Sequence, residues 1–423
     1  MRPGRWVGVA VGVATWSAAV ACTPGGGEEP DVSRVESTGL VPRHSGLGVT
    51  DAGLVGLRTG RNDEPDNVVV SHDGGRTWSA AQLPGRPAEL ELGASEHGLH
   101  VDDDLVAVVG RDTGSASPEL PVAKPQFIVW TSTDGDEWTR AVLDTAGGVV
   151  GTPTLTAVGR LLVASTRSTE GFNLFTSSDR GSSWRRAAVS GLDHPLGEDL
   201  TMEVASADGD LLSIVVGHGD GLPEGRQLLT SSDDGSTWSA QPCDRRCPYP
   251  VEAGDLASRS GEVSTDGRAT WHEPVVDPEA PGDGPTYLAA VAEVPGGWLA
   301  SARRSDVGDI SYGLLLRSGD GRSWRQMLPT DPCVGGDVGR PNSHVGAPIR
   351  LGGRWYVTYD CSNLSIPVSS VVYASGAPAG AFEPVEGTER DGVAFAEPSV
   401  DGDRILVPEL GDDGELVAVT TIG

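Results

Sequence analysis

Aromatic residues make up only 5% of this 423-residue chain, and no long segment beyond the N-terminus repeats apolar residues at helical spacing. The second absence argues against a helical protein, because packed helices carry an apolar stripe at that period. Glycine, by contrast, is abundant, with 59 residues. Many glycines in short polar turns are typical of an all-β chain, and one large β-domain can reach this length.

Basic residues are scarce as well: 31 Lys and Arg stand against 60 Asp and Glu, for a formal net charge of −29. Phosphate binding needs clustered cations, so the composition excludes a nucleic-acid partner. The acidic excess fits solubility outside the cell. Acidic clusters at 102–104 and 412–415 are more typical of solvated turns than of a calcium site, so we predict no cofactor and keep calcium as the alternative.

Only five cysteines are present, and the first of them, Cys22, ends an N-terminal signal. Arg2 and Arg5 precede an apolar run over 6–21 that is too short for a comfortable membrane span, which predicts a secretion signal over 1–21. The ending Ala-Val-Ala-Cys resembles a bacterial lipobox, which implies that Cys22 is lipidated and anchors the chain to the outside of the cell membrane; ordinary cleavage before Cys22 is the alternative. Residues 22–36 then form a flexible tether.

The other four cysteines, in an exported chain, predict two disulfides with three possible pairings. Cys243 and Cys247 are close enough in sequence to close one loop, which would leave Cys333 to pair with Cys361. A zinc site would want further Cys or His at ligand spacing, and the sequence offers none there.

Common catalytic motifs are missing too. The chain has no Gly-x-Ser-x-Gly elbow, no His-Glu-x-x-His and no Gly-Lys-Ser/Thr phosphate loop. The sequence therefore gives no direct sign of a serine hydrolase, a zincin or a nucleotide-binding enzyme.

One phrase, Ser-x-Asp-x-Gly-x-Thr-Trp, recurs six times, three of them in looser form. Short apolar runs precede most copies and the Trp opens the next run, so each copy predicts a hairpin whose Gly supplies a positive-φ turn residue. The Asp is expected to accept hydrogen bonds from the turn backbone, and the Trp to pack between sheets. The copies place these residues at Asp73 and Trp78, Asp134 and Trp138, Asp179 and Trp184, Asp233 and Trp238, Asp266 and Trp271, and Asp320 and Trp324.

Successive Asp positions are 61, 45, 54, 33 and 54 residues apart. A four-stranded propeller blade takes roughly 40 to 50 residues, so the spacing predicts a β-propeller over 37–423 with a trimmed fifth unit. A decayed unit with Phe382 in the Trp place follows, and the last strands are expected to join an N-terminal strand near 35–41 and close the ring. We expect seven blades, with six or eight as alternatives.

The phrase is the Asp box, or bacterial neuraminidase repeat, and the chain resembles sialidases and other Asp-box propellers. A frame beginning at Arg43 is similar to the first basic phrase of sialidases, although its Ile and Pro are missing. Arg61 lies in a phrase similar to the second one, and Asp66 is near the place of the general acid/base. The alternatives are a surface arginine at each Arg and a turn residue at Asp66.

A second frame resembles the sialidase strand pair that ends in another arginine of the carboxylate-binding triad, here Arg303. Arg340 is a weak match to the third. Tyr287 stands where the family has the Glu that activates its nucleophile, and the segment beginning at His344 replaces the nucleophilic Tyr. Since a Tyr nucleophile needs a carboxylate base, the catalytic set is incomplete.

The sequence therefore predicts a monomeric, lipid-anchored propeller that binds a glycan or a cell-envelope component. A sialidase with a divergent nucleophile and a protein-binding propeller, of the kind found in sortilin-type receptors or photosystem assembly factors, are the alternatives. A large exposed apolar patch would favour the protein-binding one, and a deep polar pocket a sugar.

Overall fold

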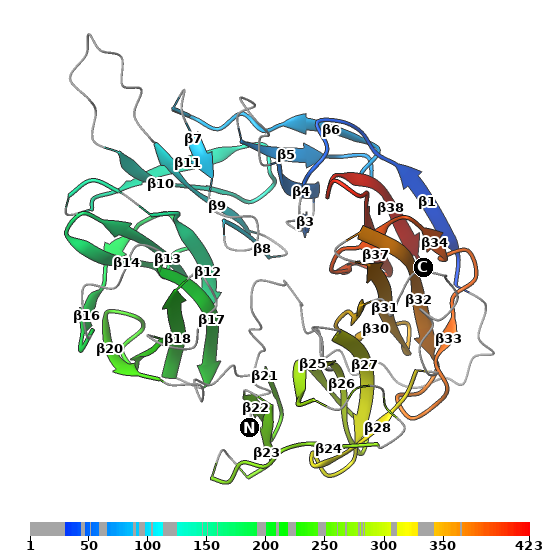
Figure 1. The fold of residues 1–423 in the computed structure, drawn as a ribbon. Helices are drawn as coiled ribbons and strands as arrows, with labels where there is room; N and C mark the ends of the chain where they lie inside the picture. The colour runs from blue at the N-terminus through cyan, green and yellow to red at the C-terminus, as the bar shows by residue number, and fades with distance from the viewer. Residues whose placement is uncertain are drawn as a thin grey trace. The chain divides into compact units, whose positions relative to one another are not determined.

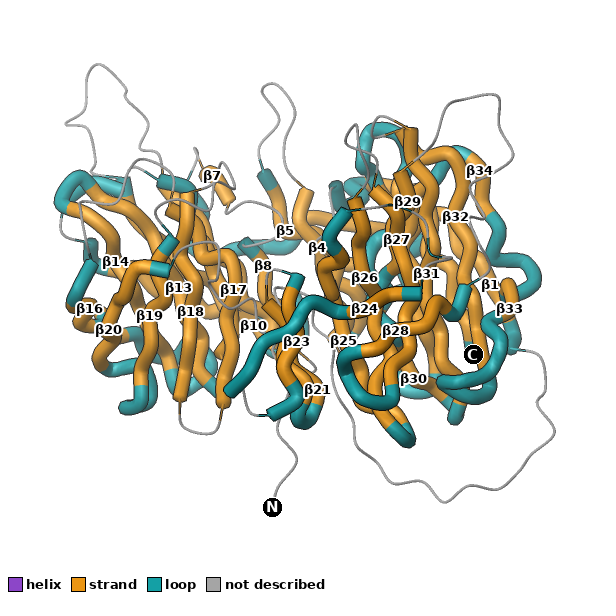
Figure 2. Tube along the Cα trace, turned by 60° about the horizontal axis from the view of Figure 1, so that its bottom comes forward, coloured by secondary structure: helices purple, strands orange, loops and turns teal. Residues whose placement is uncertain are grey.

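The computed structural model describes an all-β protein: its described residues contain strands, turns and loops and no helix (Figure 2). No helix in this part of the chain is long and apolar enough to cross a membrane. The description covers residues 30–423 except 44–46, 51, 59–65, 88–89, 93–97, 103–104, 113–124, 146, 150, 159, 193–199, 209–210, 219–225, 244–250, 260, 267–268, 278–279, 281, 283, 306–310, 329–341 and 364–365. The predicted signal and most of the predicted tether therefore lie outside it.

The chain divides into two compact units. Among the described residues, unit 1 covers 37–243, and unit 2 combines 30–36 with 251–423. Each unit is described by itself.

Unit 1 contains four sheets built mainly from consecutive antiparallel strands (Figure 1). The strand orders are β2-β6-β5-β4-β3, β11-β10-β9-β7 with β8 also on β9, β12-β13-β14-β15, and β16-β20-β19-β18-β17. Their bounds are β2 Thr38–Gly39, β3 Leu47–Thr50, β4 Gly53–Arg58, β5 Asn67–Ser71, β6 Thr77–Ala80, β7 Leu90–Leu92, β8 Leu99–Asp102, β9 Leu105–Asp112, β10 Gln126–Ser132, β11 Trp138–Leu143, β12 Thr154–Val158, β13 Leu161–Ser168, β14 Gly171–Ser177, β15 Arg185–Arg186, β16 Ala188–Ser190, β17 Leu200–Asp208, β18 Leu211–His218, β19 Gln227–Ser231 and β20 Thr237–Pro242.

Unit 2 contains a three-stranded sheet and three larger ones. The strand orders are β21-β22-β23, β24-β28-β27-β26-β25, β29-β31-β32-β33 with β30 on β31 and β34 on β32, and β1-β38-β37-β35 with β36 on β37. Their bounds are β1 Val32–Glu36, β21 Val251–Ala253, β22 Leu256–Arg259, β23 Glu262–Ser264, β24 Val275–Val276, β25 Thr286–Val294, β26 Gly297–Ser305, β27 Ser311–Ser318, β28 Ser323–Gln326, β29 Asn342–Val345, β30 Ile349–Leu351, β31 Arg354–Asn363, β32 Ile366–Ser375, β33 Glu383–Pro384, β34 Arg390–Asp391, β35 Ala394–Phe395, β36 Ser399–Asp401, β37 Arg404–Leu410 and β38 Leu416–Ile422.

These sheets are propeller blades, four-stranded antiparallel meanders that follow one another along the chain, as the sequence predicted. The trimmed fifth unit is also confirmed, as the three-stranded sheet β21–β23. The described residues form eight sheets, however, and the seven blades expected from the sequence are not confirmed. The difference lies at the C-terminus, where β35–β38 and β1 make a sheet of their own.

The outer edge of several blades is covered by the chain arriving from the preceding segment. β2 pairs in parallel with β6, β16 with β20, and β24 with β28. In each case the covered strand begins at or next to the Trp of an Asp box. The sheet then ends in a strand of only two or three residues, and such short edge strands are poor templates for pairing with another molecule.

The first Asp box shows the expected turn. The Ser71 hydroxyl donates to Asp73 Oδ1 (2.9 Å) and accepts from the Gly75 N–H (2.9 Å). Asp73 also accepts from the backbone N–H and the hydroxyl of Thr77 (2.8 and 2.6 Å), and the Trp78 indole N–H donates to the Gly75 carbonyl (2.8 Å). Gly75 has a φ of 89°, the positive value that the turn requires.

The later boxes keep the bond from the Ser hydroxyl to the Asp, and all but the second, which has Glu137 before its Trp, also keep the bond from a Thr or Ser hydroxyl. The Asp carboxylates accept from Ser132, Ser177, Ser231, Ser264 and Ser318. In the third and fourth boxes, Arg180 (φ 61°) and Asp234 (φ 53°) join the glycine in the left-handed region. This conformation costs a non-glycine residue energy, so the side-chain bonds of the box must hold the turn.

The cores lie between neighbouring sheets of one unit. Trp78 and Trp138 are 4% and 9% exposed, and Trp138 packs with β4, β5 and β9 residues between the first two sheets. Trp238 is 1% exposed between the third and fourth sheets. Phe382, in the Trp place of the decayed unit, is 4% exposed in the core of unit 2. Burial of these rings supports the expectation that the box carries an apolar wedge between blades.

The N-terminal strand completes the last sheet. β1 pairs antiparallel with β38, from Val32 opposite Ile422 to Glu36 opposite Ala418, and the two strands lie side by side in Figure 1. A strand in this region was expected, but β1 extends the folded part of the chain five residues into the predicted tether.

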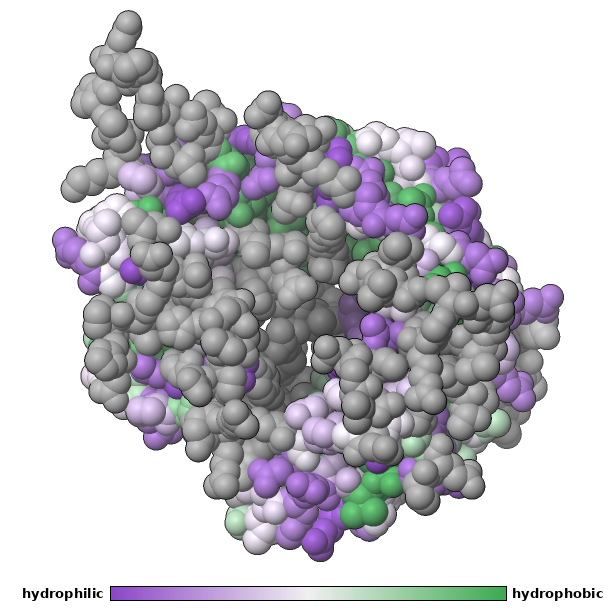
Figure 3. Space-filling model, in the orientation of Figure 1, coloured by the Kyte–Doolittle hydropathy of each residue, from purple (hydrophilic) through white to green (hydrophobic). Residues whose placement is uncertain are grey.

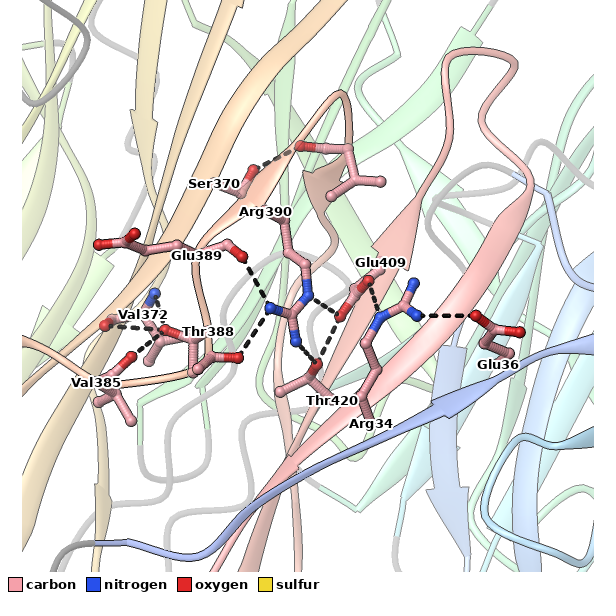
Figure 4. Close-up of polar contacts among 12 residues, drawn as sticks. Arg34, Glu36, Ser370, Val372, Val385, Thr388, Glu389, Arg390, Glu409 and Thr420 are labelled. Atoms are coloured by element: carbon pink, nitrogen blue, oxygen red, sulfur yellow. Dashed lines mark hydrogen bonds and ion pairs between the residues drawn. The ribbon is translucent and has the colours of Figure 1, made fainter.

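A fully buried carboxylate fixes β1 in place (Figure 4). Glu409 on β37 accepts hydrogen bonds from Arg34 Nε (2.8 Å), Arg390 Nε (2.9 Å) and the Thr420 hydroxyl (2.5 Å), and its side chain is 0% exposed. Two arginines and a hydroxyl thus satisfy a charge that would otherwise be costly to bury.

Candidate functional site

The residues singled out from the sequence fall into different parts of the structure. Arg43 and Asp66 belong to unit 1, and Arg303 belongs to unit 2. Arg61 and Arg340 lie outside the described residues. The two described arginines, Arg43 and Arg303, therefore belong to different units.

Arg43 is a buried residue, 6% exposed, whose backbone N–H donates to the Leu57 carbonyl (2.9 Å). The surface alternative considered for this arginine therefore does not describe it. Its burial places it in the framework beside β4, with little surface for an external ligand.

Asp66 has a structural partner. Its Oδ2 atom accepts from the Leu92 N–H (2.9 Å), and its carbonyl accepts from the Arg86 guanidinium. These contacts tie the segment just before β5 to β7 and occupy one oxygen of the Asp66 carboxylate. A general acid would need this carboxyl free to meet a substrate.

Arg303 is exposed near the end of β26. Its Nε donates to the Ser311 hydroxyl on β27, and Tyr287 on β25 lies directly opposite it in the sheet register. Directly opposite residues share one face of a sheet, with Cβ atoms about 5 Å apart. Tyr287 is itself 42% exposed, so an exposed arginine and an exposed tyrosine stand side by side.

Gly313 brings the next sheet close to Arg303. It lies opposite Arg303 on β27, and a Cβ built on it would stand 2.8 Å from His344 Cα, so only glycine allows β29 to pack here. The Ser343 hydroxyl accepts from the Gly313 N–H (2.8 Å), and Asn342 Oδ1 accepts from the Ser311 N–H (2.7 Å). These bonds hold β29 against β27.

His344 on β29 faces a carboxylate across the strand pair. Asp360 on β31 is its direct partner in the register, and His344 Nδ1 is 4.0 Å from Asp360 Oδ2, an ion-pair distance longer than a hydrogen bond. The side chain of His344 is 65% exposed, and that of Asp360 only 11%.

The other oxygen of Asp360 is fixed from behind. Oδ1 accepts from the Ser370 hydroxyl and from the Phe395 N–H (2.7 Å). The Val393 carbonyl also lies 2.7 Å from the Ser370 hydroxyl, whose single proton is shared between this carbonyl and Asp360. Asp360 is therefore oriented by the framework, with its second oxygen left to face His344.

Glu397, between β35 and β36, completes the cluster. Its Oε1 accepts from the Ala347 N–H (3.2 Å), two residues after β29 ends. Burial raises the pKa of Glu397 above its usual value, opposed by this N–H and by the charge of His344.

The charges around His344 act on its protonation. The Asp360 carboxylate raises the pKa of His344 above 6.5, Glu397 adds to this effect, and burial and the positive charge of Arg303 oppose it. We call Arg303, His344, Asp360 and Glu397 the Arg303–His344 site. It offers two exposed cationic groups, one fixed carboxylate and one carboxyl that holds its proton more tightly than usual.

The sequence pointed to half of this site. Arg303 was found by resemblance, and His344 was noticed as the residue in the tyrosine place. Asp360 and Glu397 were missed, because only the strand register and the packing of β35 on β31 bring them to His344. The one signal in the sequence for Asp360 was its place in the apolar strand segment Tyr359-Asp360-Cys361, where a charged residue is unusual.

No group of three His, Cys, Asp or Glu side chains in the described part of the chain is arranged to hold a metal ion. The acidic cluster at 412–415 contains a local turn, in which Asp413 Oδ1 accepts from the Glu415 N–H (3.1 Å).

No protein-family model matches the sequence, and no curated protein matches it. Similar solved structures include YCF48 from Cyanidioschyzon merolae, at 14% identity and a TM-score of 0.39, covering 92% of this chain and 98% of that one. The Trypanosoma rangeli sialidase in complex with the inhibitor DANA is 13% identical, with a TM-score of 0.38, covering 93% of this chain but only 60% of the sialidase. The Penicillium chrysogenum alpha-L-arabinanase complexed with arabinobiose is 14% identical, with a TM-score of 0.32, covering 75% and 89%. At these scores the likenesses carry no argument about the activity of this chain.

Proposed function

We propose that this chain is a lipid-anchored, extracytoplasmic propeller that binds a glycan or another cell-envelope component at the Arg303–His344 site. The observation that carries the proposal is the exposed Arg303, fixed by Ser311 and set beside the exposed His344. Guanidinium groups form charge-assisted, often bidentate bonds with carboxylates, and imidazoles bond to hydroxyls.

Binding without turnover is supported by what surrounds Arg303. The two carboxyls of the site, Asp360 and Glu397, act on a histidine, and the tyrosine next to Arg303 occupies the place where sialidases have a glutamate. A Tyr nucleophile with a pKa near 10 would need a carboxylate base beside it.

A sialidase of unusual arrangement is the second candidate, and one observation favours it: Tyr287 and Arg303 are opposite neighbours on one sheet face. The protein-binding alternative has less support. In unit 2 the large apolar side chains that are exposed belong to four different strands, at Val275, Tyr287, Val368 and Val400. Where Figure 3 colours described residues, hydrophilic and intermediate colours cover most of the visible surface.

The anchoring part of the proposal rests on the sequence. A lipidated Cys22 followed by a tether would hold a monomer at the outer face of the membrane, where the acidic surface suits an extracellular solvent.

The test uses residues 23–423, screened on an array of sialylated, uronic-acid-containing and neutral glycans and assayed with a fluorogenic sialoside from pH 4 to 8. We expect binding without turnover, and at least about a tenfold loss of affinity in Arg303→Ala, because one charge-assisted bidentate contact is removed. Arg322→Ala, at an exposed arginine in the sixth Asp box, is the matched control and should bind normally.

Turnover that disappears in Arg303→Ala would make the protein a sialidase and would move attention to Tyr287. Equal binding by Arg303→Ala and the parent would show that the site is elsewhere.

A further inference from the structure

The Arg303–His344 site mixes charges of both signs, and their balance changes with protonation. Arg303 stays protonated in any physiological solution, whereas His344 and Glu397 can each lose a proton. Asp360 is held in place beside them by Ser370 and the Phe395 N–H.

We propose that the site captures the carboxylate of a sugar acid in mildly acidic solution and releases it as the pH rises, with His344 and Glu397 as the groups that set this dependence. This inference rests on the proposed function and names the ligand class and the regulation of the same site.

The geometry provides the attraction. Arg303 and His344 are both exposed, and they approach each other because Gly313, opposite Arg303, lies directly under the His344 backbone. A carboxylate between them would accept from the guanidinium and from a protonated imidazole. Asp360 is only 11% exposed and already accepts two hydrogen bonds on one oxygen, so it orients His344 without filling the space in front of it.

The charged groups that act on His344 come from three elements: Asp360 from β31, Glu397 from the segment between β35 and β36, and Arg303 from β26. β27, which also packs on β29, contributes Gly313 at this point. With His344 and Glu397 both protonated, the four groups sum to one positive charge. With both deprotonated, they sum to one negative charge.

The sign of the pH dependence follows from this inversion. A bound carboxylate stabilises protonated His344 and protonated Glu397, so binding takes up protons and weakens as the pH rises. The pKa of His344 is raised above 6.5, so the proton of His344 is lost above pH 6.5. The pKa of Glu397 is also raised, above its ordinary 4.5. Each proton taken up changes the affinity by at most about tenfold per pH unit.

The experiment follows the histidine ring signals of residues 23–423 by NMR, with sodium glucuronate as the probe and glucose as the neutral control. We expect glucuronate to raise the pKa of His344 and glucose to leave it unchanged. His72 is the internal control, since it also faces a carboxylate, Asp136 at 3.2 Å, but belongs to unit 1. Its signal should titrate without responding to glucuronate.

Three variants separate the roles. Arg303→Ala should abolish the response, and His344→Gln should leave weaker binding with a smaller pH dependence than in the parent. Glu397→Gln should strengthen glucuronate binding at pH 8 by several-fold, because it removes a negative charge from the site, and this effect is opposite in sign to that of Arg303→Ala. In the parent, the affinity should be about tenfold weaker at pH 8 than at pH 5.5.

No glucuronate effect on His344, or an affinity equal at the two pH values, would overturn this inference. Glycans that bind on the array with no pH dependence would leave the proposed function standing. A clear response of His344 to glucuronate, with no glycan bound on the array, would support the carboxylate site and would contradict glycan binding as the proposed function.

Discussion

At the residue scale, the Asp box is a small local network of hydrogen bonds around one carboxylate. In four boxes the side-chain and backbone bonds lower the pKa of the Asp to about 2, from an ordinary value of 3.8. The same cause lowers the pKa of Asp134 and Asp179. The box is therefore built around the charged form of the Asp.

Acid should weaken the boxes together. Because the folded-state pKa lies below the unfolded-state pKa, the boxes stabilise the fold fully above about pH 4 and lose this contribution as the pH falls towards 2. We expect the Tm, followed by circular dichroism, to fall steeply over this range. Asp73→Asn should make the fall shallower, whereas Asp403→Asn, at a side chain that is 97% exposed, should not. The same slope in Asp73→Asn and the parent would contradict the argument.

At the scale of the element, the sequence was informative wherever one box or one strand pair decides the structure. The turn conformation, the Trp wedge and the trimmed fifth unit all follow from local patterns of Asp, Gly and Trp. The extra parallel strands β2, β16 and β24 were not predicted, because two- or three-residue pairings depend on a neighbouring blade. The pairing of the last strands with an N-terminal strand was expected, but the sequence placed that strand near 35–41, whereas β1 is Val32–Glu36. The sequence also did not show that these strands form a sheet of their own, because they carry no Asp box.

The candidate site shows the same limit. Arg303 and His344 could be located by similarity of their strands to a known pattern, but the partnership of Asp360 with His344 is a property of register. Glu397 reaches the site from the segment that connects β35 to β36. The position of such a segment cannot be predicted from a periodic pattern of residues. Buried polar bonds such as Phe395 N–H to Asp360 become visible only when strands are paired.

The attachment of strand β1 to its sheet depends on the ion pair between Arg34 and the buried Glu409. Arg34→Ala should destabilise unit 2 by about 1–2 kcal/mol, because Glu409 is fully buried but keeps Arg390 and Thr420. Chemical denaturation gives this energy, and hydrogen exchange should show β1 and β38 opening first. Glu36→Ala is the control: Glu36 also contacts Arg34 (3.4 Å) but is 82% exposed, so less than about 0.5 kcal/mol is expected. Equal losses in the two variants would show that Glu409 does not hold the strand.

At the scale of the whole molecule, the net charge of −29 makes local recognition of an anion necessary. The general field of such a chain repels acidic glycans, most strongly at low ionic strength. A ligand carboxylate can therefore be attracted only where cations are exposed and acidic neighbours are neutralised or already hydrogen-bonded. Arg303 and His344, backed by the fixed Asp360 and the protonatable Glu397, meet that condition within unit 2.

The cysteines test the predicted export of the whole chain. Cys361 lies on β31 and is 3% exposed, and Cys243 directly follows β20. Cys247 and Cys333 lie outside the described residues, so both pairings stay predictions. In residues 23–423 secreted into an oxidising compartment and unfolded in guanidinium, we expect iodoacetamide to add no mass before reduction and four groups after it. Denaturant is needed because burial alone would shield Cys361. One disulfide that joins Cys243 to Cys247 and another that joins Cys333 to Cys361 should appear as separate cross-linked peptides after digestion. Alkylation of all four thiols without a reductant would rule out the disulfides. The N-terminal signal would then be the one remaining sequence argument for an extracytoplasmic protein.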